Sequence, residues 1–207
     1  LTLSGSGTVT LGGVNSYGGI TDLNSGTLNI SGNNTTTGNF QLDGGTVIAG
    51  SDTAFGTSLL KLKNGTFEGS GGARTFDNEI QLVASTVTIG GSSDITFDGK
   101  MTLTSSRILT VTNTGMTTFG DGGIDLSSTA TNRTLTLDGT GDVTVNGVIS
   151  NGPSSTTSNL YKKGSGTLTL NGTNTYGGNT YLYDGVTEIS SEANLGANPT
   201  SFTSSRL

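Results

Sequence analysis

Four pairs of acidic residues are the side chains in this sequence best suited to acid–base chemistry. They are Asp77/Glu79, Asp94/Asp98, Asp121/Asp125 and Asp138/Asp142. Glycoside hydrolysis needs two carboxyl groups roughly 5 to 9.5 Å apart, one of them with a pKa raised by burial. The segment from Asp138 to Asp142 instead indicates a turn, because its two Asp residues flank Gly-Thr-Gly and Asp bonds readily to its own backbone. A turn or a solvated face is the favoured interpretation of every pair, so we assign no catalytic residue.

The composition removes most other site chemistry. The chain has no His, no Cys and no Trp, which excludes His-based triads, Cys nucleophiles, disulfides, and zinc or iron sites built on these residues. The segment from Gly120 to Leu126 is similar to a nonapeptide Ca²⁺-binding repeat, but Asp121 stands where the repeat has Gly and the motif occurs only once. The sequence therefore predicts no metal and no cofactor.

Four tyrosines are the candidate contacts for a carbohydrate or a partner protein: Tyr17, Tyr176, Tyr181 and Tyr183. Aromatic rings bind sugars by apolar contact, and the phenolic hydroxyl adds a polar handle. Tyr17 and Tyr176 each precede Gly-Gly at the same place in a repeated segment, so a corner residue that covers a turn is the simpler explanation for those two.

Charge and hydropathy limit the classes of partner. The formal net charge is -6 and the sequence pI is about 4.4, with only 9 Lys and Arg in 207 residues. Nucleic acid and anionic membrane surfaces need clustered cations, so neither is an expected partner. The longest apolar runs are a few residues, so the segment holds no predicted transmembrane helix and no signal peptide.

Apolar residues recur at every second position, which predicts many short β-strands with one apolar face. The 35 Gly, together with abundant Thr, Ser and Asn, add turn formers and polar strand formers. The alternating pairs are Val9/Leu11, Leu28/Ile30, Phe40/Leu42, Leu60/Leu62, Ile80/Leu82, Val87/Ile89, Ile95/Phe97, Met101/Leu103, Leu109/Val111, Ile124/Leu126, Leu135/Leu137, Val143/Val145 and Leu168/Leu170. The one helical candidate is a weak turn at 190–195.

Two 27-residue windows repeat each other without a gap, at 5–31 and 164–190. Their identities include Asn15 with Asn174 and Tyr17 with Tyr176, each surrounded by matching glycines. Internal repetition with strand-and-turn periodicity favours a parallel solenoid, in which each coil buries its inward side chains against its neighbours.

The predicted fold is all-β, a right-handed parallel β-helix of roughly eight to ten coils with about 20 to 25 residues per coil. Its narrow interior is expected to hold stacked medium-sized aliphatic residues, with Leu170 pointing inward and Thr169 outward. A β-sandwich or barrel is the alternative, favoured by the hairpin-type dipeptides Asn64-Gly65 and Asn146-Gly147.

The segment from Gly164 to Thr180, GSGTLTLNGTNTYGGNT, resembles the passenger-associated repeat of bacterial autotransporters. The resemblance covers about a quarter of the chain and extends to Gly185, but the second copy has Val186-Thr187-Glu188-Ile189 where the usual Thr-Leu pair is expected. It implies export, folding during secretion and display of an extended rod at the bacterial cell surface.

We therefore expect residues 1–207 to form a single β-helix segment of a longer exported protein. The expected role is a non-catalytic surface stalk, scaffold or adhesin whose exposed Thr/Asn face contacts a host or matrix glycan or protein. The alternatives are a self-assembling fibre or sheath subunit that associates through its end coils, and a polysaccharide-active β-helix enzyme.

Overall fold

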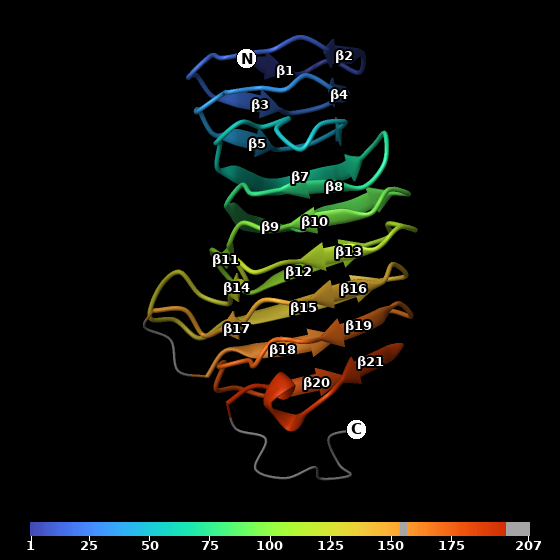
Figure 1. Ribbon diagram of the computed structural model, residues 1–207. Coiled ribbons are helices and arrows are strands. Elements are labelled where there is room, and N and C mark those ends of the chain that lie inside the picture. Colours follow the sequence, from blue (N-terminus) through green and yellow to red (C-terminus); the bar gives the residue numbers. More distant parts are fainter. Residues whose placement is uncertain (154–156, 198–207) are drawn as a thin grey trace.

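The protein is a stack of flattened β-coils. The computed structural model describes residues 1–153 and 157–197, and Figure 1 shows the coils following one another along a single axis from the N-terminus. These residues form 21 strands and one short 3₁₀ helix, Glu192–Leu195, at the predicted weak turn. Every strand pairing that joins two coils is parallel. The predicted parallel β-solenoid is thereby confirmed, and the sandwich alternative is wrong.

The strands form three ladders that run along the stack. The first ladder contains β1 (Thr2–Leu3), β3 (Thr21–Leu23), β5 (Phe40–Leu42), the beginnings of β7 (Leu60–Gly69) and β9 (Ile80–Gly91), β11 (Met101–Leu103), β14 (Ile124–Asp125) and β17 (Ile149–Ser150). The second contains β2 (Thr8–Leu11), β4 (Thr27–Ile30), β6 (Thr46–Ala49), the ends of β7 and β9, β12 (Arg107–Val111), β15 (Thr134–Gly139), β18 (Asn159–Lys162) and β20 (Thr180–Leu182). The third contains β8 (Arg74–Phe76), β10 (Ile95–Phe97), β13 (Thr117–Phe119), β16 (Val143–Val145), β19 (Thr167–Leu170) and β21 (Val186–Ile189).

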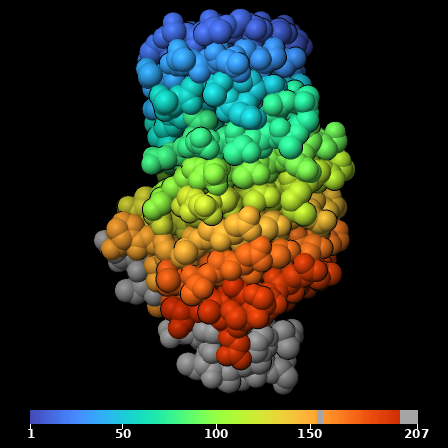
Figure 2. All heavy atoms as spheres, in the orientation of Figure 1, coloured from blue at the N-terminus to red at the C-terminus, as the bar shows by residue number. Residues whose placement is uncertain are grey.

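The number of coils follows from the second ladder, to which each coil contributes one strand. It has nine rungs in the part of the chain that the structure describes, so the molecule has about nine coils, which Figure 2 shows as successive colour bands. At a strand spacing of about 4.8 Å the rod is about 40 Å long. Residues in equivalent places are 19 apart in the first coils and 28 apart where a loop is inserted between β14 and β15.

The dipeptides that suggested hairpins have other roles. Asn64-Gly65 lies inside β7, where the pairing with β9 changes register and Gly65 has a φ of 103°. This irregularity lets a single strand pass from the first ladder to the second. Asn146-Gly147 follows β16 and leads toward β17 of the next coil. Both sites therefore turn the chain between ladders instead of folding it back on itself.

The core is a continuous column of inward side chains. All thirteen predicted alternating pairs begin within strands, and most of their side chains are buried. Leu170 is fully buried and its neighbour Thr169 is half-buried, as predicted.

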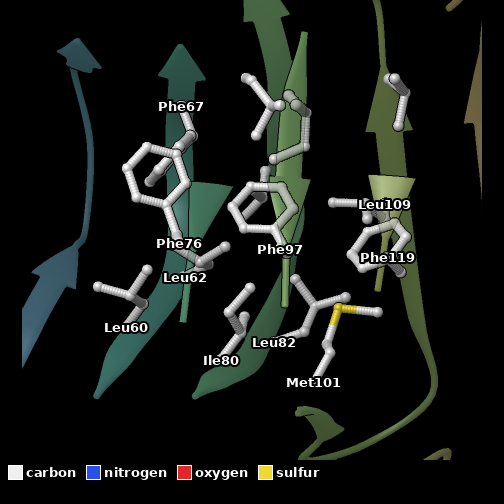
Figure 3. Close-up of a cluster of buried hydrophobic side chains, with 14 of the residues drawn as sticks. Leu60, Leu62, Phe67, Phe76, Ile80, Leu82, Phe97, Met101, Leu109 and Phe119 are labelled. Carbon is white, nitrogen blue, oxygen red and sulfur yellow. The ribbon is translucent and has the colours of Figure 1, made fainter. Parts of the chain in front are cut away.

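The centre of the column differs from the expected aliphatic filling. Six phenylalanines from four successive coils pack there with neighbouring ring centroids 4.8–6.0 Å apart, and Figure 3 shows part of this stack. They are Phe40, Phe55, Phe67, Phe76, Phe97 and Phe119. A solenoid aligns equivalent positions, so a few scattered aromatic residues become neighbours and fill the widest part of the interior.

The outward positions of two ladders are threonine columns. On the second ladder Thr8, Thr27, Thr46, Thr66, Thr88 and Thr110 pair in register through six coils. On the third ladder Thr75, Thr96, Thr118, Thr144 and Thr169 do the same and end at Glu188. Stacked β-branched side chains stabilise neighbouring strands while leaving hydroxyls to water. The columns explain a Thr-rich composition with little charge.

Where a coil lacks a strand, buried asparagines replace strand hydrogen bonds. Asn34 accepts from the Asn15 backbone N–H at 2.8 Å and donates to Ala54 O at 2.7 Å, so one side chain joins three coils. Asn174 does the same near the other end, accepting from Ile149 N–H at 2.7 Å and donating to a carbonyl of the next coil. An amide side chain supplies both a donor and an acceptor, which suits Asn34 and Asn174 to bond the coils on both sides. Asn15, the counterpart of Asn174 in the first copy, donates to Gly13 O and to Asn34 Oδ1.

The two copies occupy different ladders. In the first copy β2 and β4 belong to the second ladder and β3 to the first. In the other copy β19 and β21 belong to the third ladder and β20 to the second. Gly26 and Gly185, equivalent in the copies, have φ near +75° and a backbone carbonyl 2.3–2.5 Å from where a Cβ would stand. The repeat therefore encodes a corner and its flanking strands, and not a fixed face of the rod.

Candidate binding surface

Three tyrosines meet on the outside of the second ladder, at its last two rungs. The Tyr161 and Tyr181 ring centroids are 4.5 Å apart, Tyr161 and Tyr183 are 5.6 Å apart, and Tyr181 and Tyr183 stack at 6.2 Å with planes 14° apart. We call Tyr161, Tyr181 and Tyr183 the tyrosine cluster. Aromatic pairs at these separations stabilise each other beyond the area that they bury.

Strand register places the rings. Tyr161 on β18 pairs directly with Tyr181 on β20, and Tyr183 follows two residues later, on the same side of the extended chain. The amide of Asn179 donates to the Tyr181 hydroxyl at 3.0 Å, and the Lys163 ammonium lies 5.2 Å from the Tyr183 ring centroid. The cluster is thus a supported surface with a cation at one side.

The cluster combines apolar area with accessible edges. Tyr183 is 59% exposed, whereas Tyr161 and Tyr181 are half-buried. Burial raises the pKa of Tyr161 above its ordinary value, and the neighbouring Tyr181 and Tyr183 make smaller contributions in the same direction. Tyr161 therefore keeps its phenolic proton at neutral pH and remains a hydrogen-bond donor as well as an apolar surface.

Lys162 lies beneath this surface, at a position that carries aliphatic residues in other coils. Its side chain is buried, and its ammonium donates to three backbone carbonyls, those of Lys163 and Gly164 at 2.7 Å and that of Asp184 at 3.3 Å. Desolvation lowers its pKa, against the opposing effect of nearby carboxylates. This lysine holds the corner between the second and third ladders.

The two tyrosines of the repeat have a structural position. Tyr176 is fully buried, and its hydroxyl meets Thr180 Oγ1, which itself donates to Leu195 O at 3.0 Å. Tyr17 makes the matching contact with Thr21 at 2.9 Å and is half-buried in the first coil. Both rings point into the coil and do not cover a turn from outside. Tyr176 has no surface with which to contact a carbohydrate, so its place among the candidates is corrected.

Tyr161 is the surface residue that the sequence interpretation missed. It belongs to no motif, and it stands beside Lys162-Lys163. The signal that would have found it is the coil length: Tyr161 precedes Tyr181 by one coil of 20 residues, and stacked coils bring such positions together. Tyr181 and Tyr183, by contrast, lie on the surface as expected.

Two of the four acidic pairs, Asp94/Asp98 and Asp138/Asp142, bind backbone N–H groups. The carboxylates of Asp94, Asp98 and Asp142 each accept an N–H from the next coil, at 2.7–2.9 Å. Asp138 accepts from the following Gly139 N–H at 2.7 Å at the end of β15, and the predicted turn is a bend at 140–141, between β15 and β16. These carboxylates therefore help to hold adjacent coils and corners together.

The remaining acidic residues separate into different surroundings. Asp125 accepts from the Ser150 hydroxyl at 2.5 Å and pairs with Lys100 at 3.4 Å, while Asp77 and Glu79 are exposed beside a hollow described below. Within the described ranges, no group of three or more acidic side chains is placed to hold a metal ion. The same ranges contain no helix that is both long and apolar enough to cross a membrane.

Comparison with known proteins bears on the repeated segments. The passenger-associated-transport-repeat family matches residues 1–30, 24–49 and 160–189. The chain carries passenger-associated transport repeats. The first and third matches cover all but the last residue of the two copies found in the sequence, and the match at 24–49 adds a further copy. The repeats stand in the first coils and in the last.

Passenger-associated transport repeats are typical of the β-helical passengers of autotransporters. They indicate a structural passenger region and imply secretion or surface exposure. No curated protein and no solved structure matches the chain significantly. The evidence on function is therefore the repeat, the solenoid and the surfaces that the solenoid presents.

Proposed function

We propose that this chain is a non-catalytic rod in the passenger of a bacterial surface protein, and that it spaces or presents an adhesive surface away from the cell. The observation that carries the proposal is the presence of passenger-associated repeats in the first and the last coils of the stack of about nine that the structure describes. A stack in which each coil binds only its neighbours can fold coil by coil as it emerges from a membrane. The lack of Cys also avoids disulfide formation before export.

Surface display is tested in the source bacterium with an antibody raised against residues 1–197. We expect intact cells to bind the antibody, and added protease to remove the signal without lysis. The intact mass of the protein is also measured in the membrane, secreted and polymer fractions. In the membrane fraction we expect a species heavier than the 20.8 kDa of this chain. Signal only after lysis would refute display.

The adhesive surface that we propose is the tyrosine cluster, with a host or matrix glycan as its partner. Rings spaced 4.5–6.2 Å apart, with hydroxyls and an adjacent ammonium, offer apolar contact to sugar rings and hydrogen bonds to their hydroxyls. A glycan array probed with the wild type and with Tyr183→Ala is the test. We expect Tyr183→Ala to weaken the bound glycans severalfold and Thr88→Ala, outside the cluster, to leave them unchanged. Equal binding by both variants would contradict this assignment.

Self-association through an end coil is the second candidate. Val9 is 39% exposed although it pairs in register with Leu28, which is fully buried. A coil stacked on the first coil would bury Val9 and pair with β2, and a second copy of the chain is one source of such a coil. Sedimentation velocity over a wide concentration range tests it: growth of polymers with concentration supports stacking, and a monomer throughout removes it.

A further inference from the structure

A groove lined mainly by residues with hydroxyl, amide or carboxylate groups lies on the side of the rod over the second, third and fourth coils. It consists of two adjoining hollows of about 570 and 550 Å³ that share Asn34, Thr35 and Thr53. Both hollows are open to solvent, so a ligand would lie along the surface of the rod without being enclosed. The groove runs from the loops of the second and third coils to the residues around β8, the first strand of the third ladder, and is separate from the tyrosine cluster at the other end of the rod.

The groove exists because the third side of these coils is built from loops. Residues 31–39 and 50–59 form no strand where later coils have the third ladder. In the third coil a tight turn draws the chain inward: Ala54 N–H bonds Ser51 O, and Ser58 N–H bonds Phe55 O, so that the Phe55 ring enters the core. Gly56 permits the turn, with a φ of 53° and Thr36 O 2.4 Å from where its Cβ would stand. Departures from a regular scaffold are common places for binding residues.

The lining is rich in hydroxyls. Thr35 and Thr37 of the second coil and Thr53 and Thr57 of the third are exposed along it. The inward neighbours Asn34 and Thr36 are buried and hydrogen-bonded to the third coil, so the outward hydroxyls stand on a fixed backbone. Each hydroxyl both donates and accepts.

Carboxylates bound the groove. Asp77 and Glu79 of the fourth coil line one hollow and are exposed, and neither forms an ion pair with a cation among the described residues. Arg74 lines the other hollow, but its guanidinium is already bound to Ser70 O at 2.7 Å, Gly71 O at 2.7 Å and Asp52 at 3.4 Å. The described lining thus offers carboxylates and hydroxyls but no cationic side chain that is free of partners. Its negative charge repels acidic ligands.

We propose that this groove binds a linear, neutral oligosaccharide. Sugar hydroxyls donate to the carboxylates of Asp77 and Glu79, where the hydrogen bonds are charge-assisted, and exchange hydrogen bonds with the threonine row. The continuity of the two hollows favours a chain long enough to enter both. The groove would give the rod a glycan contact beyond the tyrosine cluster.

Titration calorimetry and NMR shift mapping on the full chain test the groove, with linear neutral glucan oligosaccharides from the disaccharide to the hexasaccharide as probes. We expect affinity to rise with length until both hollows are occupied. Thr35→Val keeps the shape and removes one hydroxyl, so it should weaken the longest bound probe about fivefold. Glu79→Gln should weaken it about tenfold by removing a charged acceptor.

The controls separate this groove from the tyrosine cluster. Thr88→Val makes the same chemical change on the second ladder, and Tyr183→Ala alters the cluster; both should leave glucan affinity within twofold. The proposal is overturned if no member of the series binds, if Thr35→Val and Glu79→Gln bind like the wild type, or if Tyr183→Ala abolishes binding. Loss through Tyr183→Ala would assign the glucan to the cluster and leave the proposed surface role intact.

Discussion

Tyr176 should make the rod lose stability at alkaline pH. Its ring is fully buried in the last coils, and burial raises the pKa of its phenol to about 12, against the smaller opposing effect of the hydrogen bond to Thr180. In the unfolded chain the phenol ionises near pH 10. The folded state therefore keeps a proton that the unfolded state releases.

The sign and size of the effect follow from this difference. A group whose pKa is raised by folding contributes stability that is complete below the unfolded pKa and is lost as the pH rises through the folded pKa. Two pKa units correspond to about 3 kcal/mol. We expect the free energy of unfolding to fall by about this amount between pH 10 and pH 12, in addition to the effects of other groups.

Tyr176→Phe keeps the ring in the core and removes the ionisable group. Urea unfolding followed by circular dichroism at a series of pH values from 8 to 12 compares it with the wild type. At pH 8 the variant should be less stable by about 1 kcal/mol, for the lost hydrogen bond. The difference should shrink and then reverse as the pH rises, because the variant lacks the alkaline loss.

Tyr17→Phe is the matched control, because it removes the equivalent hydroxyl with the equivalent partner, Thr21, from the half-buried position in the first coil. We expect it to retain the wild-type fall in stability with pH. If Tyr176→Phe shows the same pH dependence as the wild type, burial of the phenol is not what limits alkaline stability and the reasoning is refuted.

Three further predictions test the positions of individual side chains and turns. Leu170→Asp buries an unpaired carboxylate and should lower the free energy of unfolding in urea by more than about 4 kcal/mol. Thr144→Asp lies on the outward threonine column and should change it by less than about 1 kcal/mol. Similar costs for the two variants would refute the assignment of inward and outward positions. Because burial lowers the pKa of the Lys162 ammonium, the wild type should gain stability as the pH rises toward 10.5. Lys162→Met should remove this gain. If the variant's stability rises with pH as the wild type's does, Lys162 is not its cause. Gly45→Ala should cost about 1–3 kcal/mol because φ is +72° and a carbonyl lies 2.3 Å from its Cβ position, while Gly19→Ala, with open space around it, should be tolerated in thermal melts.

The alternation of apolar residues and the repeated 27-residue windows were enough to predict a parallel solenoid and the number of its coils. Period-two patterns state which side chains point inward, and repetition at a distance states that like positions stack. The resemblance to passenger-associated repeats, carried by those windows, is confirmed by the family match. These features are encoded locally, within one coil and its corner.

Contacts between coils were decided by register, which the sequence leaves open because coil length varies from 19 to 28 residues. The phenylalanine stack, the pairing of Tyr161 with Tyr181 and the groove beside Asp77 and Glu79 all depend on which residue lies above which. Tyr176 shows the same limit: its motif marked a special position, but its direction followed from the absence of a strand there. The sequence by itself determined the coil and its inward face, and only the tertiary structure determined which surfaces those coils build together, because side chains far apart along the chain become neighbours only when successive coils stack in a fixed register.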